Sequence, residues 1–270
     1  MDLYRDVALA TAFPLSFAVI QGGHLQEVHH GGVALPWASV TKLITALTVL
    51  QAAMDGVVDL QDAAGPPGAT LGHLLAHASG LAFDEDRIIA PPGKRRAYSN
   101  RGIEVAAARL CEASGRSFEM EARERVLGPL RMSSTELSRS PAHSASGPVE
   151  DLAALAAELT MPRVLPRSTV EALSSVAFPG LAGILPGYGR QKPCDWGYGA
   201  EVRGSKSPHW TAPGNSPSTF GHFGQSGSFL WVDPAHEVGL TFLSGTAFGP
   251  WAIDLWPRLS AAVLAAYGGK

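Results

Sequence analysis

A serine and a lysine three residues apart, Ser39 and Lys42, stand where an apolar helical segment begins. This spacing places both side chains on one face of a helix, so the lysine amine can reach the serine hydroxyl. A serine hydroxyl becomes a useful nucleophile only when a neighbouring group takes its proton. Burial can lower the pKa of a lysine far enough for this role, and the apolar neighbours Val40, Leu43 and Ile44 predict such burial. The pair therefore predicts nucleophilic catalysis.

A Tyr-x-Asn sequence, Tyr98 and Asn100, follows downstream and offers further groups that this chemistry needs. A tyrosine hydroxyl can act as an acid or a base, and an amide can orient a lysine or a substrate. In a chain of this composition, chance produces about 0.4 Ser-x-x-Lys matches and about 0.04 Tyr-x-Asn matches. In the alternative interpretation, Ser39 caps a helix with a solvated lysine, Tyr98 packs in a loop, and Asn100 caps the next helix.

Further motifs accompany these residues in a fixed order. They are Leu-Leu-Ala-His-Ala-Ser-Gly-Leu at 74–81, Pro-Pro-Gly-Lys-Arg-Arg-Ala at 91–97, Trp-Gly-Tyr-Gly at 196–199, and Phe-Gly-His-Phe-Gly-Gln-Ser-Gly-Ser-Phe-Leu-Trp-Val-Asp-Pro at 220–234. Together with Ala-Ser-Val-Thr-Lys-Leu at 38–43, this succession resembles the β-lactamase-related serine hydrolases. These include class C β-lactamases, D-Ala-D-Ala carboxypeptidases and family VIII carboxylesterases. The resemblance covers residues 15 to 245.

The resemblance implies a role for each matching residue. Ser39 corresponds to the acylated nucleophile, Lys42 to its partner, and Tyr98 to the general base and acid that serves Ser39 and the leaving group. Asn100 corresponds to the amide that orients the substrate and the lysine. The backbone N–H groups of Ser39 and Gln225 would form the oxyanion hole. Whether Lys42 or Tyr98 takes the first proton stays open.

One motif departs from the family pattern. His222, Phe223 and Gly224 stand where the family has Lys-Thr-Gly, whose cation and hydroxyl suit a substrate carboxylate. A histidine is mostly neutral at pH 7 unless its pKa is raised, and a phenylalanine has no hydroxyl. Some carboxypeptidase-like members also carry histidine at this position. The departure favours an uncharged acyl ester or amide over penicillins and cell-wall peptides, and His222 is expected to position the substrate or tune Tyr98.

Two other patterns suggest different chemistry and are weaker. His73 and His77 have the i, i+4 spacing of a metal pair, but Leu74 stands where a zinc protease has its glutamate, so no metal is expected. Ser226 follows Gly224 and Gln225 as in a nucleophile elbow, but the elbow's last glycine is replaced by a serine. A catalytically silent binding module with the same fold is the alternative to an enzyme.

Composition limits the possible partners. The chain has 270 residues, 46% of them apolar, and a net charge of −3, so neither nucleic acid nor an anionic membrane is expected to bind. Cys111 and Cys194 are too few for a disulfide framework. Asp2, Asp6 and Pro14 argue against a signal peptide, and a cytoplasmic location is expected. The expected partner is a small-molecule ester, amide or lactam without a cofactor, and the oligomeric state is left open.

Hydrophobic periodicity predicts the elements that must position these residues. A buried helix is expected over residues 40–56, because Leu43, Leu47 and Leu50 recur at helical spacing. Strands are expected near both ends of the chain, at 15–21, 25–30, 198–202, 229–232 and 238–243. Further helices are expected after Thr70, Asn100, Ser117 and Pro148, and over 251–267.

This layout predicts an α+β fold of the β-lactamase/transpeptidase type. An antiparallel β-sheet built from both chain ends is flanked by helices, and a helical lobe is inserted between them. The prediction is one domain over 1–270, with an α/β lobe at about 1–56 and 180–270 and the helical lobe at about 57–179. The polar stretch 138–147 is expected to be a surface loop, and 204–219 a disordered segment or a rim of the active-site cleft between the lobes.

Overall fold

The structure is a computed structural model that describes residues 13–269. The first part of the segment considered as a signal peptide, residues 1–12, lies outside the described residues. A sheet of six antiparallel strands runs through the molecule in the order β2-β1-β10-β9-β8-β7. Its strands are β1 (Leu15–Gln21), β2 (His24–His29), β7 (Glu201–Val202), β8 (Phe220–Phe223), β9 (Phe229–Asp233) and β10 (Val238–Ser244). Because β1 pairs with β10, the sheet joins the two ends of the chain, as predicted.

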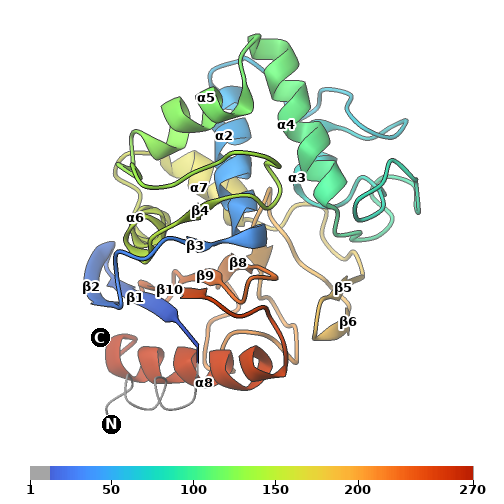
Figure 1. Ribbon diagram of the computed structural model, residues 1–270. Coiled ribbons are helices and arrows are strands. Elements are labelled where there is room, and N and C mark those ends of the chain that lie inside the picture. The colour runs from blue at the N-terminus through green and yellow to red at the C-terminus, as the bar shows by residue number, and fades with distance from the viewer. Residues whose placement is uncertain (1–12, 270) are drawn as a thin grey trace.

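Helices cover both faces of this sheet. The helix α8 (Pro250–Tyr267) lies on one face, and the other helices lie on the opposite side (Figure 1). They are α2 (Thr41–Met54), α3 (Leu71–Leu75), α4 (Asn100–Ser114), α5 (Phe118–Ala122), α6 (Val149–Thr160) and α7 (Arg167–Ser174), with the 3-10 helix η1 (Ala38–Val40) and the π-helix η2 (Arg123–Leu127). The α+β fold class is confirmed. Within the segment expected to be the helical lobe, α6 packs directly on β1, β9 and β10.

The strands carry apolar side chains on both faces. In β10, Val238, Leu240 and Phe242 belong to the core under α8, whereas Leu243 belongs to the core on the opposite face. Alternate residues of a strand point to opposite faces, so a sheet covered on both sides needs apolar residues at nearly every position. This requirement explains why β1, β9 and β10 read as nearly continuous apolar runs, whereas the edge strand β2 carries polar residues and is exposed or half-buried.

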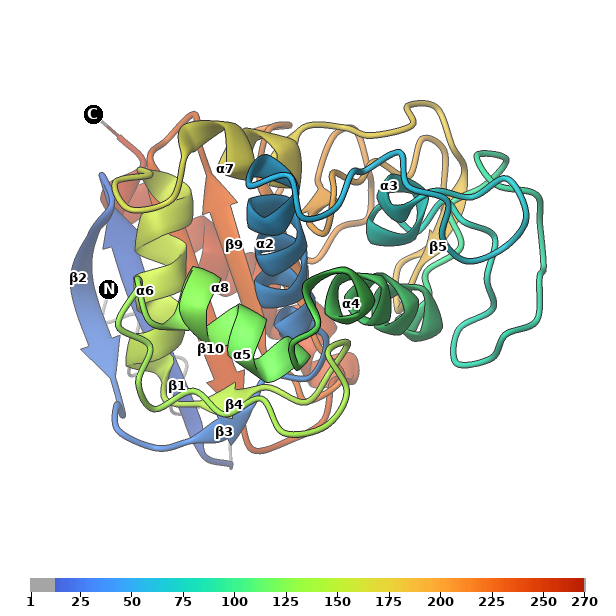
Figure 2. The same cartoon turned by 90° about the horizontal axis from the view of Figure 1, so that it is seen from above.

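The helix α2 is the central scaffold on which the site is built. Every residue from Thr41 to Leu50 is buried, which confirms the expectation from its apolar sequence. Seen from above, α2 lies between α6 and α4, with α7 near its C-terminal end (Figure 2). A helix enclosed on all sides holds its first turn in a fixed position relative to the sheet, and this first turn contains Lys42.

Several predicted element ends differ from the structure. The helix α3 ends at Leu75, and His77 has a φ of 54°, so His73 and His77 do not share one helix face. Ser99 rather than Asn100 caps α4, because its hydroxyl accepts from the Gly102 N–H at 2.9 Å. A two-stranded sheet of β3 and β4, which are distant in the chain, and a short hairpin, β5–β6, were not predicted. They consist of β3 (Leu35–Pro36), β4 (Ser146–Gly147), β5 (Gly183–Leu185) and β6 (Gly189–Gln191).

Part of the segment 204–219, which was predicted to be disordered or a rim of the active-site cleft, is built into the core. Its side chains Lys206, His209 and Trp210 are buried, and all three contact the carboxylate of Glu201 on β7. Lys206 Nζ lies 2.9 Å from Glu201 Oε1 and also donates to the Asp195 carbonyl at 2.9 Å. Polar residues can therefore be buried here because each finds a charged or hydrogen-bonding partner.

This buried ion pair leads to a prediction for stability. Replacing Lys206 with methionine is expected to lower the free energy of unfolding by about 3 kcal/mol, because it leaves the Glu201 carboxylate buried without its cation. Urea unfolding followed by circular dichroism measures the change. The matched control is Arg87→Gln, which removes an ion pair whose side chains are 65% and 64% exposed. That substitution is expected to cost less than about 1 kcal/mol, and equal losses in the two variants would contradict the prediction.

Among the helices within residues 13–269, none is long and apolar enough to cross a lipid bilayer.

Candidate active site

Ser39 lies in η1, immediately before α2, where β8 approaches the start of that helix. The preceding residue, Ala38, has a φ of 46°, in the left-handed region that non-glycine residues rarely occupy. Such strain is often found where the fold fixes a functional side chain. Ser39 Oγ is 3.1 Å from Lys42 Nζ. The structure therefore brings the predicted serine and lysine together within hydrogen-bond distance.

The amine of Lys42 is completely buried and has three hydrogen-bond partners. Besides Ser39 Oγ, these are Asn100 Oδ1 at 2.6 Å and the carbonyl oxygen of Ala142 at 2.9 Å. Burial lowers the pKa of Lys42 to about 7, although the negative charges of Asp84 and Glu104 act in the opposite direction. A substantial fraction of Lys42 is therefore neutral at physiological pH and able to accept a proton.

The neutral amine has two N–H donors and one lone pair. Two of the three partners, Asn100 Oδ1 and the Ala142 carbonyl, are acceptors only, so each must take one N–H. The lone pair is then left for the third partner, Ser39 Oγ–H. The arrangement thus suits Lys42 for removing the proton of Ser39.

The ring of Tyr98 lies beside the same two residues. Lys42 Nζ is 4.8 Å from the ring centroid, and the Tyr98 hydroxyl interacts with Ser39. Burial raises the pKa of Tyr98 above its ordinary value, and the interaction with Ser39 offsets only part of this effect. Tyr98 therefore stays protonated near neutral pH, a state in which it can donate a proton but cannot accept one as a phenolate.

His222 on β8 faces Tyr98 from the other side. Burial, reinforced by the charge of Lys42, lowers the pKa of His222 to about 3, so the imidazole is neutral. Its Nδ1 lies 2.7 Å from the Phe223 carbonyl and must carry the proton to donate there. Nε2 is then an acceptor, 3.5 Å from the Tyr98 hydroxyl. His222 offers no positive charge where the family's Lys-Thr-Gly has a lysine.

Asn100 connects Lys42 with an acidic residue that the sequence analysis did not identify. Its Oδ1 accepts from Lys42, and its Nδ2 donates to Asp84 Oδ1 at 2.9 Å. Asp84 lies in the acidic run Asp84-Glu85-Asp86, and nothing in that run indicates which carboxylate turns toward the site. The carbonyl of Ala142 was also missed, because the loop 138–147 was expected only at the surface and a backbone carbonyl has no sequence signature.

The end of β8 approaches the backbone of Ser39 closely. A Cβ at Gly224 would lie 3.0 Å from the Ser39 backbone nitrogen and 2.5 Å from the Trp37 carbonyl oxygen, so a side chain here would collide with the segment that carries the nucleophile. Within residues 13–269, neither Ser39 N–H nor Gln225 N–H has a hydrogen-bond partner. Both donors thus remain free for a substrate oxygen.

Ser226, the alternative nucleophile, has no such surroundings. It lies in the turn between β8 and β9, and its hydroxyl donates to Ser228 Oγ at 3.1 Å. His73 and His77 also do not form a metal pair. The ring Nδ1 of His73 contacts Thr70 Oγ1 at 2.9 Å, while the Nδ1 of His77 accepts from the Ser99 N–H at 3.2 Å. Within the described residues, no group of three histidine, cysteine or acidic side chains could hold a metal ion.

A narrow cavity of about 70 Å³ opens at Ser39. Its walls are mainly apolar or aromatic, and they come from several segments that are distant in the sequence. The lining residues are Ser39, Phe83, Tyr98, Leu185, Pro186, Trp196, Glu201, His222, Phe223 and Gln225. The hairpin β5–β6 contributes the wall at Leu185 and Pro186, and it was not predicted. The predicted motif at 196–199 contributes Trp196, whose ring is 5.3 Å from that of His222.

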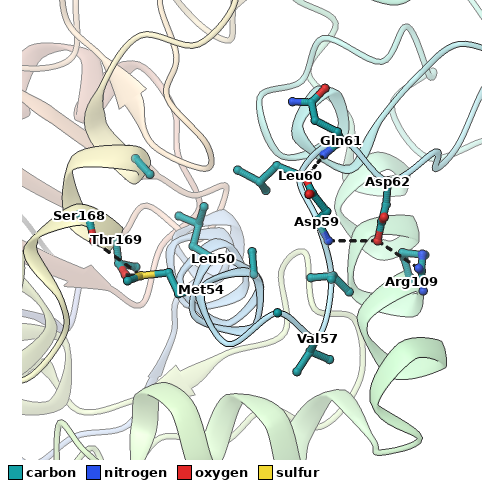
Figure 3. A pocket seen from close by; sticks show the side chains of 14 residues that line it. Leu50, Met54, Val57, Asp59, Leu60, Gln61, Asp62, Arg109, Ser168 and Thr169 are labelled. Atoms are coloured by element: carbon teal, nitrogen blue, oxygen red, sulfur yellow. Dashed lines mark hydrogen bonds and ion pairs between the residues drawn. The ribbon is translucent and has the colours of Figure 1, made fainter.

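A larger cavity of about 730 Å³ lies at the opposite end of α2 (Figure 3). Leu50 and Met54 form part of its floor, and Met54 Sδ accepts from the Thr169 hydroxyl at 2.8 Å. Its rim contains an ion pair of 3.0 Å between Arg109 and Asp62. This cavity lacks a nucleophile with an adjacent base, so size alone would mark the wrong site. The chemistry of Ser39 and Lys42 identifies the smaller cavity as the candidate active site.

Comparison with known proteins agrees with this assignment. The family model described as Beta-lactamase matches residues 15–264. The chain belongs to the beta-lactamase family. The crystal structure of a beta-lactamase from Mycobacterium bovis shares 45% sequence identity with this chain, with a TM-score of 0.95, and the match covers 98% of this chain and 99% of that chain. Membership in this family indicates serine hydrolase activity in general.

Two solved structures with lower sequence identity share the fold. The octameric penicillin-binding protein homologue from Pyrococcus abyssi has a TM-score of 0.75 at 18% identity, covering 98% of this chain and 77% of that chain. Simvastatin synthase from Aspergillus terreus has a TM-score of 0.76 at 14% identity, covering 98% of this chain and 93% of that chain. No curated protein matches the sequence.

Proposed function

We propose that this member of the beta-lactamase family is a serine hydrolase that forms an acyl-enzyme on Ser39 with small, uncharged acyl esters or amides. The observation that carries the proposal is the contact of 3.1 Å between Ser39 Oγ and the buried amine of Lys42. Packing of the core does not require a lysine at this position, because an apolar side chain would fill the same space at a lower desolvation cost. The lysine is costly to bury and useful mainly as a base.

The proposed reaction proceeds in two steps. Lys42 takes the proton of Ser39 as Oγ bonds to the substrate carbonyl carbon, and the N–H groups of Ser39 and Gln225 stabilise the resulting oxyanion. Tyr98 donates its proton to the leaving oxygen or nitrogen as that bond breaks, and the proton held by Lys42 then restores the Tyr98 hydroxyl. In the second step, water attacks the acyl-enzyme, gives up its proton to the same base, and Ser39 Oγ regains a proton as the acid leaves.

The lining of the cavity supports an uncharged substrate. Within the described residues, none of its lining side chains is a cation, and Glu201 adds a carboxylate to one wall. His222 is neutral because its pKa is lowered to about 3. A substrate carboxylate would have to leave water without gaining a positively charged partner, which is unfavourable. An acetyl or butyryl group, in contrast, could bury its methyl and methylene groups against Leu185 and Phe223.

A second candidate is β-lactamase or D-Ala-D-Ala carboxypeptidase activity. The 45% identity with the beta-lactamase from Mycobacterium bovis favours the first of these two activities. Hydrolysis of p-nitrophenyl acetate and butyrate, nitrocefin and a D-Ala-D-Ala peptide distinguishes the two. We expect kcat/KM for the better ester to exceed that for nitrocefin by about 100-fold. A preference for nitrocefin or the peptide would instead support the second candidate, and no turnover of any substrate would favour a catalytically silent binding module.

The pKa shifts predict that kcat/KM changes with pH on the acid side only. Catalysis needs Lys42 as the neutral amine, so kcat/KM is expected to rise as the pH increases through about 7, the pKa of Lys42, and then to reach a plateau. Tyr98 acts while protonated, and because its pKa is raised, the plateau should extend to about pH 9. Initial rates of p-nitrophenyl ester hydrolysis, corrected for spontaneous hydrolysis, give this profile. If activity rose only above pH 10, a Tyr98 phenolate would be the base instead.

A further inference from the structure

We propose that Asp84 is a positioning residue that fixes the side-chain amide of Asn100, and thereby directs the lone pair of Lys42 toward Ser39. This inference rests on the proposed function, because it concerns the proton transfer from Ser39. The juxtaposition that carries it is a chain of contacts: Asp84 Oδ1 to Asn100 Nδ2 at 2.9 Å, Asn100 Oδ1 to Lys42 Nζ at 2.6 Å, and Lys42 Nζ to Ser39 Oγ at 3.1 Å.

The amide of Asn100 has two possible orientations with different consequences. In the observed orientation, Oδ1 faces Lys42 and accepts an N–H, so the lysine lone pair is left for Ser39. If the amide turned by 180°, Nδ2 would face Lys42 and donate to that lone pair. A lone pair engaged by an N–H donor is no longer available to remove a proton. The orientation of Asn100 therefore decides whether neutral Lys42 can serve as a base.

Lys42 alone controls the amide only in its charged form. An ammonium group has donors only, so it selects Oδ1 of Asn100. The neutral amine can donate or accept, and it therefore accommodates either orientation. When Lys42 is neutral and can act as a base, a second group must therefore hold the Asn100 amide in the observed orientation.

Asp84 meets this requirement because a carboxylate only accepts hydrogen bonds. Turning the amide would place Asn100 Oδ1 against Asp84 Oδ1, two acceptors without a hydrogen between them. Charge-assisted hydrogen bonds of this kind are stronger than neutral ones, so their loss opposes the flip. Asp84 is exposed, so its carboxylate needs no other buried partner.

The charge of Asp84 has a separate effect. The titratable and charged groups around Lys42 are Asp84 from the loop after α3, Glu104 from α4, Tyr98 and His77 at the aromatic wall, and His222 from β8. Asp84 and Glu104 raise the pKa of Lys42. Removing the charge of Asp84 should therefore move the acid limb of the pH–rate profile to lower pH, but charge alone would leave the plateau unchanged.

The substitution Asp84→Asn separates the two effects. An amide at position 84 can donate to the turned Asn100, so both orientations of Asn100 become accessible. We expect the plateau of kcat/KM for p-nitrophenyl acetate to fall by about tenfold, and the rate of Ser39 labelling by a fluorophosphonate to fall with it. Asp84→Glu, which keeps an acceptor-only carboxylate, should retain most of the wild-type plateau. Asp86→Asn is the matched control, since Asp86 pairs with Arg101 at 2.6 Å and does not contact Asn100.

Each outcome has a defined meaning. A lower plateau in Asp84→Asn with retention in Asp84→Glu and Asp86→Asn supports the proposal. If Asp84→Asn shifts the acid limb of the pH–rate profile but leaves the plateau of kcat/KM unchanged, Asp84 acts only through its charge and the proposal is overturned. Equal losses of plateau kcat/KM in Asp84→Asn and Asp84→Glu would also overturn the proposal. If the folded wild-type protein itself neither reacts with the fluorophosphonate nor hydrolyses the esters, the proposed function fails instead. The two failures are therefore distinguishable.

Discussion

Replacing Ser39 with alanine is expected to reduce kcat for p-nitrophenyl ester hydrolysis by at least about 10⁴-fold. The loss is large because Oγ forms the covalent bond to the acyl carbon, and no other hydroxyl replaces it. The small side chain leaves the strained backbone at Ala38 and the packing of α2 unchanged, so the fold should be retained. Burst-phase and steady-state kinetics measure the effect, with circular dichroism as the test of folding.

Ser226→Ala is the matched control for this prediction. Ser226 lies in a sequence similar to a nucleophile elbow, but its hydroxyl bonds to Ser228 and contacts no base. Its substitution should leave kcat within about threefold of the wild type. A large loss in Ser226→Ala together with a small loss in Ser39→Ala would reverse the assignment of the nucleophile.

Replacing Lys42 with methionine is expected to lower kcat/KM by at least about 10³-fold and to remove the limb near pH 7. Methionine matches the apolar stem of lysine in the buried channel but cannot take a proton. It also leaves Asn100 Oδ1 and the Ala142 carbonyl without their donor, which should cost about 2 kcal/mol of stability. Activity should therefore be compared at a temperature where both proteins are folded.

For Lys42→Met, the loss of the rise in kcat/KM near pH 7 is a more specific readout than the loss of rate. A loss of stability alone would lower the rate at all pH values but would not remove a titration. The exposed Lys94, which precedes Tyr98 in the sequence, provides the control variant Lys94→Met. We expect this control to keep both the rate and the limb. A limb that persisted near pH 7 in Lys42→Met would show that another group takes the proton of Ser39.

The residues that sequence reasoning located are those whose chemistry depends on side-chain type and local spacing. Ser39 and Lys42 needed only one helical turn to come together. Tyr98 and Asn100 were identified by their order along the chain, and the structure brings both to the same amine. The sheet was also predictable, because its central strands are apolar on both faces and cannot be stable elsewhere.

The missed features depend on tertiary contacts. Asp84 is one of several acidic residues in its loop, and only the fold shows that it contacts Asn100. The Ala142 carbonyl could come from any residue in a loop that passes over α2. The segment 204–219 reads as exposed because its residues are polar. Part of it is ordered against the core because Glu201 pairs with the buried Lys206 and Asp233 accepts from Ser216, and such pairings have no local pattern.

The most direct test of the central claim is tandem mass spectrometry of the wild-type protein after reaction with a fluorophosphonate probe. The account predicts one covalent adduct, on the peptide that contains Ser39, formed faster as the pH rises through about 7, in step with the pKa of Lys42. The Ser39→Ala protein should carry no adduct under the same conditions. An adduct on another residue, or labelling of Ser39 at a rate independent of pH across that range, would contradict the claim that Lys42 activates Ser39 as the nucleophile.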